Sequence, residues 1–171
     1  MKKILLTGGS GFIGCNLVKL LIDHRYELIN IDILTPRNSS QKKYWIECDV
    51  LDKDKMNKII KEFDPNYIVH LAARTDLRGF NLSDYEVNTI GTRNLIESIA
   101  SLKNLKKVLF ASSRLVCKIG HKPKNEDEYS ATTPYGKSKI ESELIIRKEC
   151  KQVKYDWIIF RPTSIWGPWF D

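Results

Sequence analysis

A tyrosine and a lysine stand four positions apart in the segment TPYGKSK, residues 133–139. On a helix Tyr135 and Lys139 would share one face, since residues i and i+4 are neighbours there. In water a phenol titrates near pH ~10 and a lysine amine near ~10.4, so neither is a base at neutral pH. A close ammonium group favours the phenolate, and moving a tyrosine pKa from about 10 to about 7 takes about 4 kcal/mol. The pair therefore indicates a site where Tyr135 takes a proton from a substrate hydroxyl, although the same spacing also fits two unrelated surface residues.

A glycine-rich segment near the N-terminus offers a second kind of chemistry. In LLTGGSGFIG the residues Gly8, Gly11 and Gly14 lie three apart, directly after an apolar run and at the start of a helical pattern. Glycines permit a tight turn and let the backbone approach a pyrophosphate, and a helix N-terminus offers free N–H groups to the anion. The segment predicts a dinucleotide site.

Two acids follow the next two predicted strands. Asp32, 18 residues beyond Gly14, is placed to accept hydrogen bonds from the adenosine ribose hydroxyls, which favours NAD. Arg37 lies close enough in sequence to leave NADP as an alternative. Asp49 would meet the adenine edge, or would instead cap the helix that follows it.

The elements that must position these groups alternate between strand and helix patterns. Such alternation predicts an α/β fold, a Rossmann-like doubly wound parallel sheet with helices on both faces, as a single domain over residues 1–171. The predicted strands are Ile4–Thr7, Glu27–Asp32, Tyr44–Cys48, Tyr67–Leu71, Lys107–Ser112 and Tyr155–Arg161. The predicted helices are Phe12–Asp23, Lys53–Phe63, Ser83–Ser101 and Pro134–Lys151, with a long loop at Arg114–Thr133.

The topology brings the two kinds of chemistry together. A dinucleotide across the carboxyl ends of the strands would place its nicotinamide near Ser112 and Ser113 and near the helix that carries Tyr135 and Lys139. The positive nicotinamide ring would help to lower the tyrosine pKa, and Ser113 would hydrogen-bond the reacting oxygen. Tyr135 would then serve as base and acid in turn while a hydride moves.

Composition and charge exclude several classes of protein. The chain has 42% hydrophobic and 29% charged residues, which predicts a globular protein. Its net charge of +7 suits an anionic partner such as a nucleotide, but the lysines are scattered among acids, so we predict no nucleic-acid partner. The four cysteines are far apart in sequence, which predicts neither zinc nor a disulfide framework, and no apolar run indicates export or a membrane span. We expect a cytoplasmic protein.

The ordered motifs resemble those of the extended short-chain dehydrogenase/reductases, the NAD-dependent nucleotide-sugar epimerases and dehydratases. The resemblance covers essentially the whole chain. The motifs are TGGSGFIG, NIDI, CDV, HLAA (70–73), VNTIGTRNLIE (87–97), FASSRLV (110–116), YGKSK and RPTSIWGP.

The resemblance implies roles for individual residues. Tyr135 would be the catalytic acid/base, Lys139 would bind the nicotinamide ribose, and Ser113 would orient the substrate hydroxyl. His70 belongs to the same motifs, but we interpret it as a packing residue. The implied cofactor-binding residues, with no metal ligand among them, are Gly8, Gly11, Phe12, Ile13, Gly14, Asp32, Asp49, Val50, Leu71, Ala72, Ala73, Asn88, Tyr135, Lys139 and Pro162.

Departures from the family pattern guide the choice of reaction. The 4,6-dehydratases of the family carry Asp-Glu directly after the catalytic Ser or Thr, whereas this chain has Arg114 and Leu115, which disfavours dehydration. The expected function is a nucleotide-sugar epimerase, or its cofactor-binding domain. The alternatives are an NAD(P)-dependent sugar or alcohol dehydrogenase/reductase and a non-catalytic dinucleotide-binding module.

The resemblance also bears on the rest of the protein. Family members run well past 171 residues, so we expect the substrate-binding C-terminal part to be absent and this chain to bind NAD with little turnover. Aromatic residues fill the last positions, WGPWF, and we expect further protein to cover them, unless they fold back onto this domain. A homodimer through the helices 83–101 and 134–151 is also implied.

Overall fold

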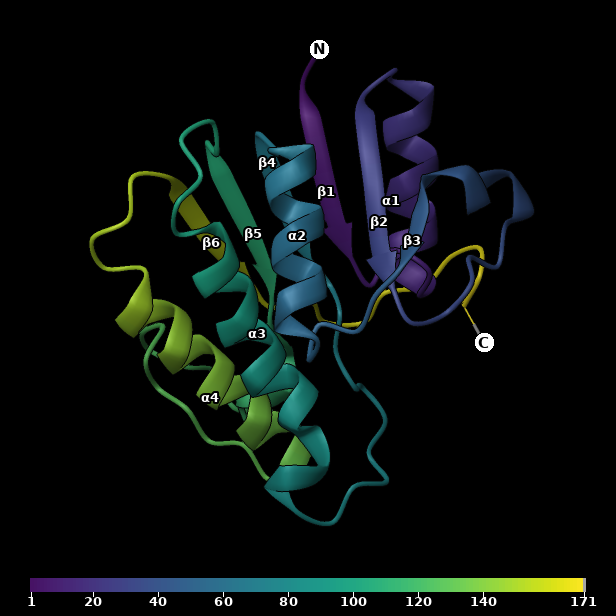
Figure 1. The fold of residues 1–171 in the computed structure, drawn as a ribbon. Coiled ribbons are helices and arrows are strands. Elements are labelled where there is room, and N and C mark those ends of the chain that lie inside the picture. Colours follow the sequence, from purple (N-terminus) through teal and green to yellow (C-terminus); the bar gives the residue numbers. More distant parts are fainter. Residues whose placement is uncertain (171) are drawn as a thin grey trace.

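The computed structural model describes residues 1–170, which form one six-stranded parallel sheet. The strand order is β3-β2-β1-β4-β5-β6, and every neighbouring pair is parallel. The strands are β1 (Lys3–Thr7), β2 (Glu27–Asp32), β3 (Trp45–Glu47), β4 (Tyr67–His70), β5 (Lys107–Ala111) and β6 (Asp156–Phe160). The chain runs outward from β1 to β3, returns to β4 beside β1, and then continues to β6, as a doubly wound sheet does (Figure 1).

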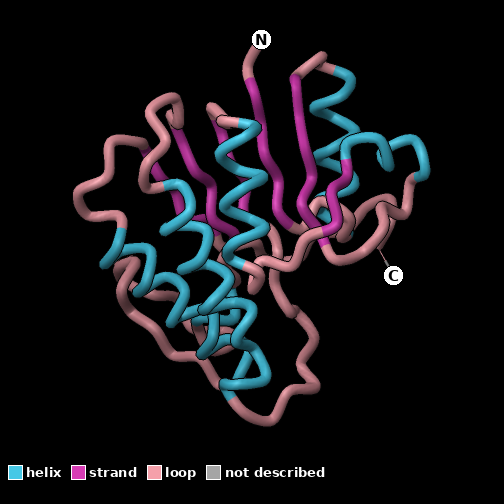
Figure 2. The backbone as a smooth tube through the Cα atoms, viewed as in Figure 1, coloured by secondary structure: helices cyan, strands magenta, loops and turns pink. Residues whose placement is uncertain are grey.

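Helices cover both faces of the sheet, which confirms the predicted fold class. The helices are α1 (Phe12–Asp23), α2 (Lys53–Phe63), α3 (Glu86–Ile99) and α4 (Pro134–Glu149), with short 3-10 turns η1 (Ser39–Tyr44), η2 (Leu82–Tyr85) and η3 (Arg114–Val116). In Figure 2 the cyan helices α2, α3 and α4 lie on the near side of the magenta strands.

Alternate residues of β1 divide the core into two clusters, because successive side chains of a strand point to opposite faces. Leu5 joins the larger cluster, which includes Met56 of α2 and Leu95 of α3. Ile4 and Leu6 join the smaller cluster, with Val18 and Leu21 of α1 and Leu28 of β2. The central strand is therefore buried on both faces, and its position within the fold is fixed.

One predicted helix is wrong at its start. The predicted helix Ser83–Ser101 is divided into η2 and the longer α3, because Asn81 and Asp84 form a capping box that begins a 3-10 turn first. The start of α4 is as predicted: Pro134 occupies the first turn, and the Thr133 hydroxyl accepts a hydrogen bond from the Gly136 N–H at 3.0 Å.

The carboxyl ends of all six strands point to the same edge of the sheet, at the bottom of Figure 1. The last residues of the chain also return to this edge. Phe170 packs edge-on against Phe12 at 5.0 Å between ring centroids, and the Asn16 side chain donates to the Pro168 carbonyl at 2.8 Å. Trp166 nevertheless remains 84% exposed.

Residues 1–170 contain neither a membrane-spanning helix nor a cluster of metal-ligating side chains. No helix in this range is long and apolar enough to cross a bilayer. The same residues contain no cluster of three or more His, Cys, Asp or Glu side chains that could hold a metal ion.

Candidate active site

The glycine turn between β1 and α1 is formed by close backbone contacts. Gly8 has φ +74°, and a Cβ there would lie 2.5 Å from the Ala72 backbone nitrogen, so only glycine fits. A Cβ on Gly14 would overlap the Gly8 carbonyl oxygen. Asn30 holds the turn from β2: its side-chain oxygen accepts from the Gly9 N–H at 2.8 Å, and its amide donates to the Ser10 hydroxyl at 3.1 Å.

The N-terminus of α1 is open to an anion. Gly11 is the N-cap, and among residues 1–170 no side-chain cap bonds the first turn of the helix. The N–H groups of that first turn, which begins at Phe12 and Ile13, are therefore available to a phosphate group.

Asp32 ends β2 beside this turn. Its carboxylate oxygens accept hydrogen bonds from the Ser10 N–H at 2.9 Å and the Leu34 N–H at 3.0 Å. These bonds orient the carboxylate, and each oxygen can accept a further bond from a hydroxyl group.

A cleft of about 630 Å³ follows the carboxyl edge of the sheet from the glycine turn to α4. It joins the adenosine and nicotinamide ends that the sequence predicts. Of the predicted cofactor residues, those that line it are Gly8, Gly11, Phe12, Ile13, Gly14, Asp32, Asp49, Val50, Leu71, Ala72, Ala73, Tyr135, Lys139 and Pro162.

The alternative interpretation of Asp49, as a helix cap, is wrong. Asp52 is the N-cap of α2, and its carboxylate accepts a hydrogen bond from the Lys55 N–H at 3.0 Å. The Asp49 carboxylate accepts instead from the Leu51 N–H at 2.9 Å, in a short turn that lines the cleft.

The three predicted catalytic side chains meet at the far end of the cleft. Tyr135 and Lys139 lie one turn apart on α4 and are 7% and 4% exposed. Ser113 follows β5, is 8% exposed, and is near enough to Tyr135 to lower the pKa of its phenol. Ser113 is not among the residues that line the cleft, so it reaches the site through Tyr135.

The charge states of the pair differ from the expectation that a neighbouring ammonium lowers the tyrosine pKa. Burial raises the pKa of Tyr135, and the hydrogen bond from Ser113 opposes this rise only in part. Burial lowers the pKa of Lys139 to about 8, against the charge of Glu143, which raises it. The protein residues alone thus keep Tyr135 protonated, because taking a phenolate out of water costs more than these neighbours return.

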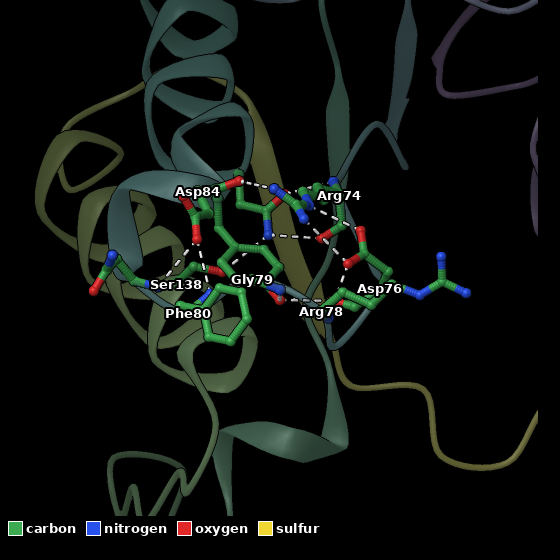
Figure 3. A network of polar contacts seen from close by, with 10 residues as sticks. Arg74, Asp76, Arg78, Gly79, Phe80, Asp84 and Ser138 are labelled. Carbon is green, nitrogen blue, oxygen red and sulfur yellow. Dashed lines mark hydrogen bonds and ion pairs between the residues drawn. The ribbon is translucent and has the colours of Figure 1, made fainter.

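A network of hydrogen bonds fixes the loop between β4 and η2 (Figure 3). The Asn88 side chain accepts from the Arg74 N–H at 2.8 Å and donates to the Arg74 carbonyl at 3.1 Å and to the Ser138 hydroxyl at 2.9 Å. The Tyr85 hydroxyl donates to the Asp76 carbonyl at 2.8 Å and accepts from the Gly79 N–H at 3.1 Å.

Asn88 is thus only 1% exposed and does not line the cleft. It connects α4, beside the catalytic pair, to the backbone at Arg74, which does line the cleft. Its observed contacts position the loop at the nicotinamide end.

His70 lies beneath this site as a buried, neutral side chain. Burial, together with the charge of Lys139, lowers its pKa to about 3. Its Nδ1 lies 2.7 Å from the Thr7 hydroxyl and its Nε2 lies 3.2 Å from the Thr92 hydroxyl. Because the Thr92 hydroxyl donates to the Asn88 carbonyl at 2.7 Å, it accepts the Nε2 proton of His70.

Sequence reasoning missed several residues of the cleft. Ile33 and Leu34 line the cleft and are 60% and 63% exposed. The sequence signal that could have found them is a pair of apolar residues directly after Asp32, the acid that ends a predicted strand. Arg74 and Thr75 follow the HLAA segment and also line it, without a sequence signal that we recognise.

Comparisons with known proteins place this geometry in a family. A family model described as the NAD dependent epimerase/dehydratase family matches residues 4–171. A putative UDP-glucose 4-epimerase of Methanocaldococcus jannaschii is 31% identical over 96% of this chain and 56% of its own length.

Solved structures show the same fold. UDP-glucose 4-epimerase of Thermotoga maritima, determined with UDP-glucose, superposes with a TM-score of 0.84 at 26% identity, over 99% of this chain and 58% of that one. dTDP-glucose 4,6-dehydratase of Bacillus anthracis, determined with NAD, gives 0.83 at 27% identity, over 99% and 57%.

The chain therefore spans about half the length of the relatives it matches. The match extends across the glycine turn, the sheet and α4, so it includes both ends of the cleft. This chain belongs to the NAD-dependent epimerase/dehydratase family.

Proposed function

We propose that residues 1–171 form the NAD-binding part of a nucleotide-sugar epimerase. The observation that supports this most is the single cleft in which an uncapped helix N-terminus and Asp32 lie at one end and Tyr135 and Lys139 at the other. Its volume of about 630 Å³ is in the range of cofactor sites.

The residues present fit a dinucleotide. A pyrophosphate would accept hydrogen bonds from the first-turn N–H groups of α1, at the tight turn that Gly8 and Gly14 permit. Asp32 would accept from the ribose hydroxyls and repel a 2′-phosphate, so we propose NAD rather than NADP. Lys139 would donate to the hydroxyls of the nicotinamide ribose.

When bound, NAD would supply hydride transfer from C4 of the sugar and back to the opposite face of the ring. The Tyr135 Oη takes the proton of the C4 hydroxyl as the carbon becomes a carbonyl, and it returns a proton when the carbonyl is reduced. The Ser113 hydroxyl, a neighbour of Tyr135, orients the reacting oxygen. Because burial raises the pKa of Tyr135 in the protein alone, the positive nicotinamide ring is the charge that would make the phenol acidic enough.

Residues next to Ser113 favour epimerisation over elimination. Arg114 and Leu115 form the 3-10 turn η3, and neither side chain can act as a general acid or base for loss of water. Relatives of this chain include dehydratases and a reductase, so the reaction type is the part of the proposal that needs direct measurement.

Three further parts of the proposal concern the whole protein. We propose that this chain alone binds NAD with little turnover, because its relatives are nearly twice as long.

We propose a homodimer through α3 and α4, which present the exposed apolar residues Ile90 and Leu144. Four buried, unpaired thiols support a reducing, cytoplasmic location.

Calorimetry with NAD and NADP tests the cofactor, and an assay for interconversion of UDP-glucose and UDP-galactose tests the reaction. We expect one NAD site, weaker binding of NADP, and loss of that preference in Asp32→Ala. Failure of NAD to bind would remove the proposal. Net formation of NADH with substrate would indicate a dehydrogenase instead, and rapid epimerisation by this chain would refute the expected lack of turnover.

A further inference from the structure

A fully buried carboxylate lies one helical turn beyond Lys139. The Glu143 side chain is 0% exposed, yet the pKa of its carboxyl is lowered: burial raises it, but hydrogen bonds from Arg161 and Ser112 outweigh burial. A buried charge is costly unless it is paired and hydrogen-bonded. The contacts of the Glu143 carboxylate show which segments this buried charge holds together.

Three segments converge on this carboxylate. Oε1 accepts from the Ser112 hydroxyl at 2.5 Å and from Arg161 Nε at 2.8 Å. Oε2 accepts from Arg161 Nη2 at 2.6 Å and from the Tyr129 hydroxyl at 2.9 Å. Ser112 follows β5, Arg161 follows β6, and Tyr129 belongs to the loop of residues 117–133, so Glu143 joins all three to α4.

The segment around Ser113 is tied to α4 through this carboxylate. The Ser112 N–H donates to the Phe160 carbonyl at 2.8 Å and the Arg114 N–H donates to the Pro162 carbonyl at 3.1 Å, which fix the segment to β6. The hydroxyl of Ser112 adds the bond to α4, the helix that carries Tyr135 and Lys139. Glu143 thus links the segment that carries Ser113 to the helix that carries the catalytic pair.

The loop of residues 117–133 is held by the arginine side chains that bind Glu143. Arg161 Nη2 also donates to the Glu126 carbonyl at 2.6 Å, and its guanidinium lies over the Tyr129 ring at 5.3 Å from the centroid. Arg147, one turn beyond Glu143, bonds the Glu126 carboxylate at 3.1 Å and lies 4.0 Å from Glu143. The buried carboxylate thus has two guanidinium groups beside it.

Glu143 also acts on the charge of Lys139. Burial favours the neutral amine, and the negative charge of Glu143 opposes that effect. The other titratable groups near Lys139 are Tyr135 on α4 and His70 on β4, which are both neutral at pH 7. Arg161, which follows β6, and Arg147 of α4 both lie against Glu143, at 2.6 Å and 4.0 Å.

We propose that Glu143 is a positioning residue for the catalytic site: from one helical turn beyond Lys139, its carboxylate holds Ser112 and thus Ser113 against α4 and places a negative charge on the helix that carries the catalytic pair. This inference rests on the proposed function, because it concerns the same three catalytic side chains. It assigns a role to a residue outside the cleft that touches neither cofactor nor substrate.

The test is an NMR titration of Lys139 in protein labelled with ¹³C at the lysine Cε atoms, assigned with a Lys139→Met variant. In Glu143→Gln the midpoint of Lys139 should fall by about one pH unit or more. Glu141→Gln makes the same chemical change at an exposed position of α4 and should leave the midpoint unchanged. An equal midpoint in the native protein and in Glu143→Gln would overturn the inference.

Two further variants keep the test decisive if Glu143→Gln does not fold. Glu143→Met/Arg161→Met removes both charges without leaving either buried alone, and the Lys139 midpoint should still fall. Ser112→Ala keeps the charge, so the midpoint should stay constant while amide exchange of residues 112–116 becomes about tenfold faster. An unchanged exchange rate in Ser112→Ala would remove the positioning of Ser113.

A parallel NAD titration separates the two proposals. If the native protein fails to bind NAD while Lys139 still responds to Glu143, the proposed function falls and the electrostatic link stands. If NAD binds and Lys139 does not respond, the proposed function stands and the role of Glu143 is overturned.

Discussion

Replacing Lys139 by methionine should make the protein more stable near neutral pH. Burial lowers the pKa of this amine from 10.5 to about 8, so the folded state binds its proton less tightly than the unfolded state does. The difference of about 2.5 pH units, at about 1.36 kcal/mol each, corresponds to about 3 kcal/mol of unfolding free energy lost below pH ~8. Methionine has a similar length and carries no charge, so Lys139→Met should recover most of this.

The direction of the Lys139 pKa shift determines the pH range over which the stability of the protein changes. Between pH ~8 and ~10.5 the unfolded chain holds the proton and the folded protein has released it, so the stability of the native protein rises with pH in that range. The advantage of Lys139→Met should therefore shrink by about 2.5 kcal/mol between pH 7 and pH 10.

Urea unfolding of both proteins, followed by tryptophan fluorescence at pH 7, 8, 9 and 10, measures this difference. Other groups titrate in the same range, but they are common to both proteins and largely cancel. If the stability difference between Lys139→Met and the native protein stays constant from pH 7 to pH 10, the pKa of Lys139 is not lowered in the folded state, and the reasoning is refuted.

Three other predictions follow from the site. Gly14→Ala should destabilise the protein and weaken NAD binding by at least about tenfold, because the new Cβ would overlap the Gly8 carbonyl, whereas Gly120→Ala, with open space around it, should leave NAD binding unchanged in calorimetry. The free energy of unfolding should fall as the pH drops below ~6.5, because neutral His70 has a pKa of about 3; His70→Gln should show a smaller fall in acid urea titrations, and an equal fall would contradict this role. Tyr85→Phe should cost about 1–2 kcal/mol and speed amide exchange at Gly79, because it removes hydrogen bonds to two loop residues; normal protection of Gly79 would be the contrary result.

The parts of the fold and cleft that depend on local sequence were predictable. The glycine turn, the strand-end Asp32 and the pair on α4 each occupy a few neighbouring residues, and the parallel order of the strands brings them to one edge. The predicted strand and helix bounds were accurate within about two residues for the same reason, since apolar periodicity is a local signal. The start of α3 was wrong because the capping box at Asn81 and Asp84 competes with the helical pattern.

The network behind the cleft could not be predicted in this way. Asn88 bonds to Ser138, 50 residues away, and Ser112 bonds to Glu143, 31 residues away, so neither contact leaves a mark in a local pattern. The raised pKa of Tyr135 in the protein alone could not be predicted, because spacing shows which groups are neighbours but does not show how far both are removed from water. Burial dominates the pKa of Tyr135 and that of Lys139.

The proposed mechanism depends on the cofactor making a buried tyrosine acidic. The most direct measurement is an NMR titration of Tyr135, labelled with ¹³C at Cζ, with and without saturating NAD. The pKa of Tyr135 should lie above the ordinary value of a phenol in the protein alone and below it with NAD, and this fall should be smaller in Lys139→Met. A Tyr135 pKa that is unchanged by bound NAD would contradict the account.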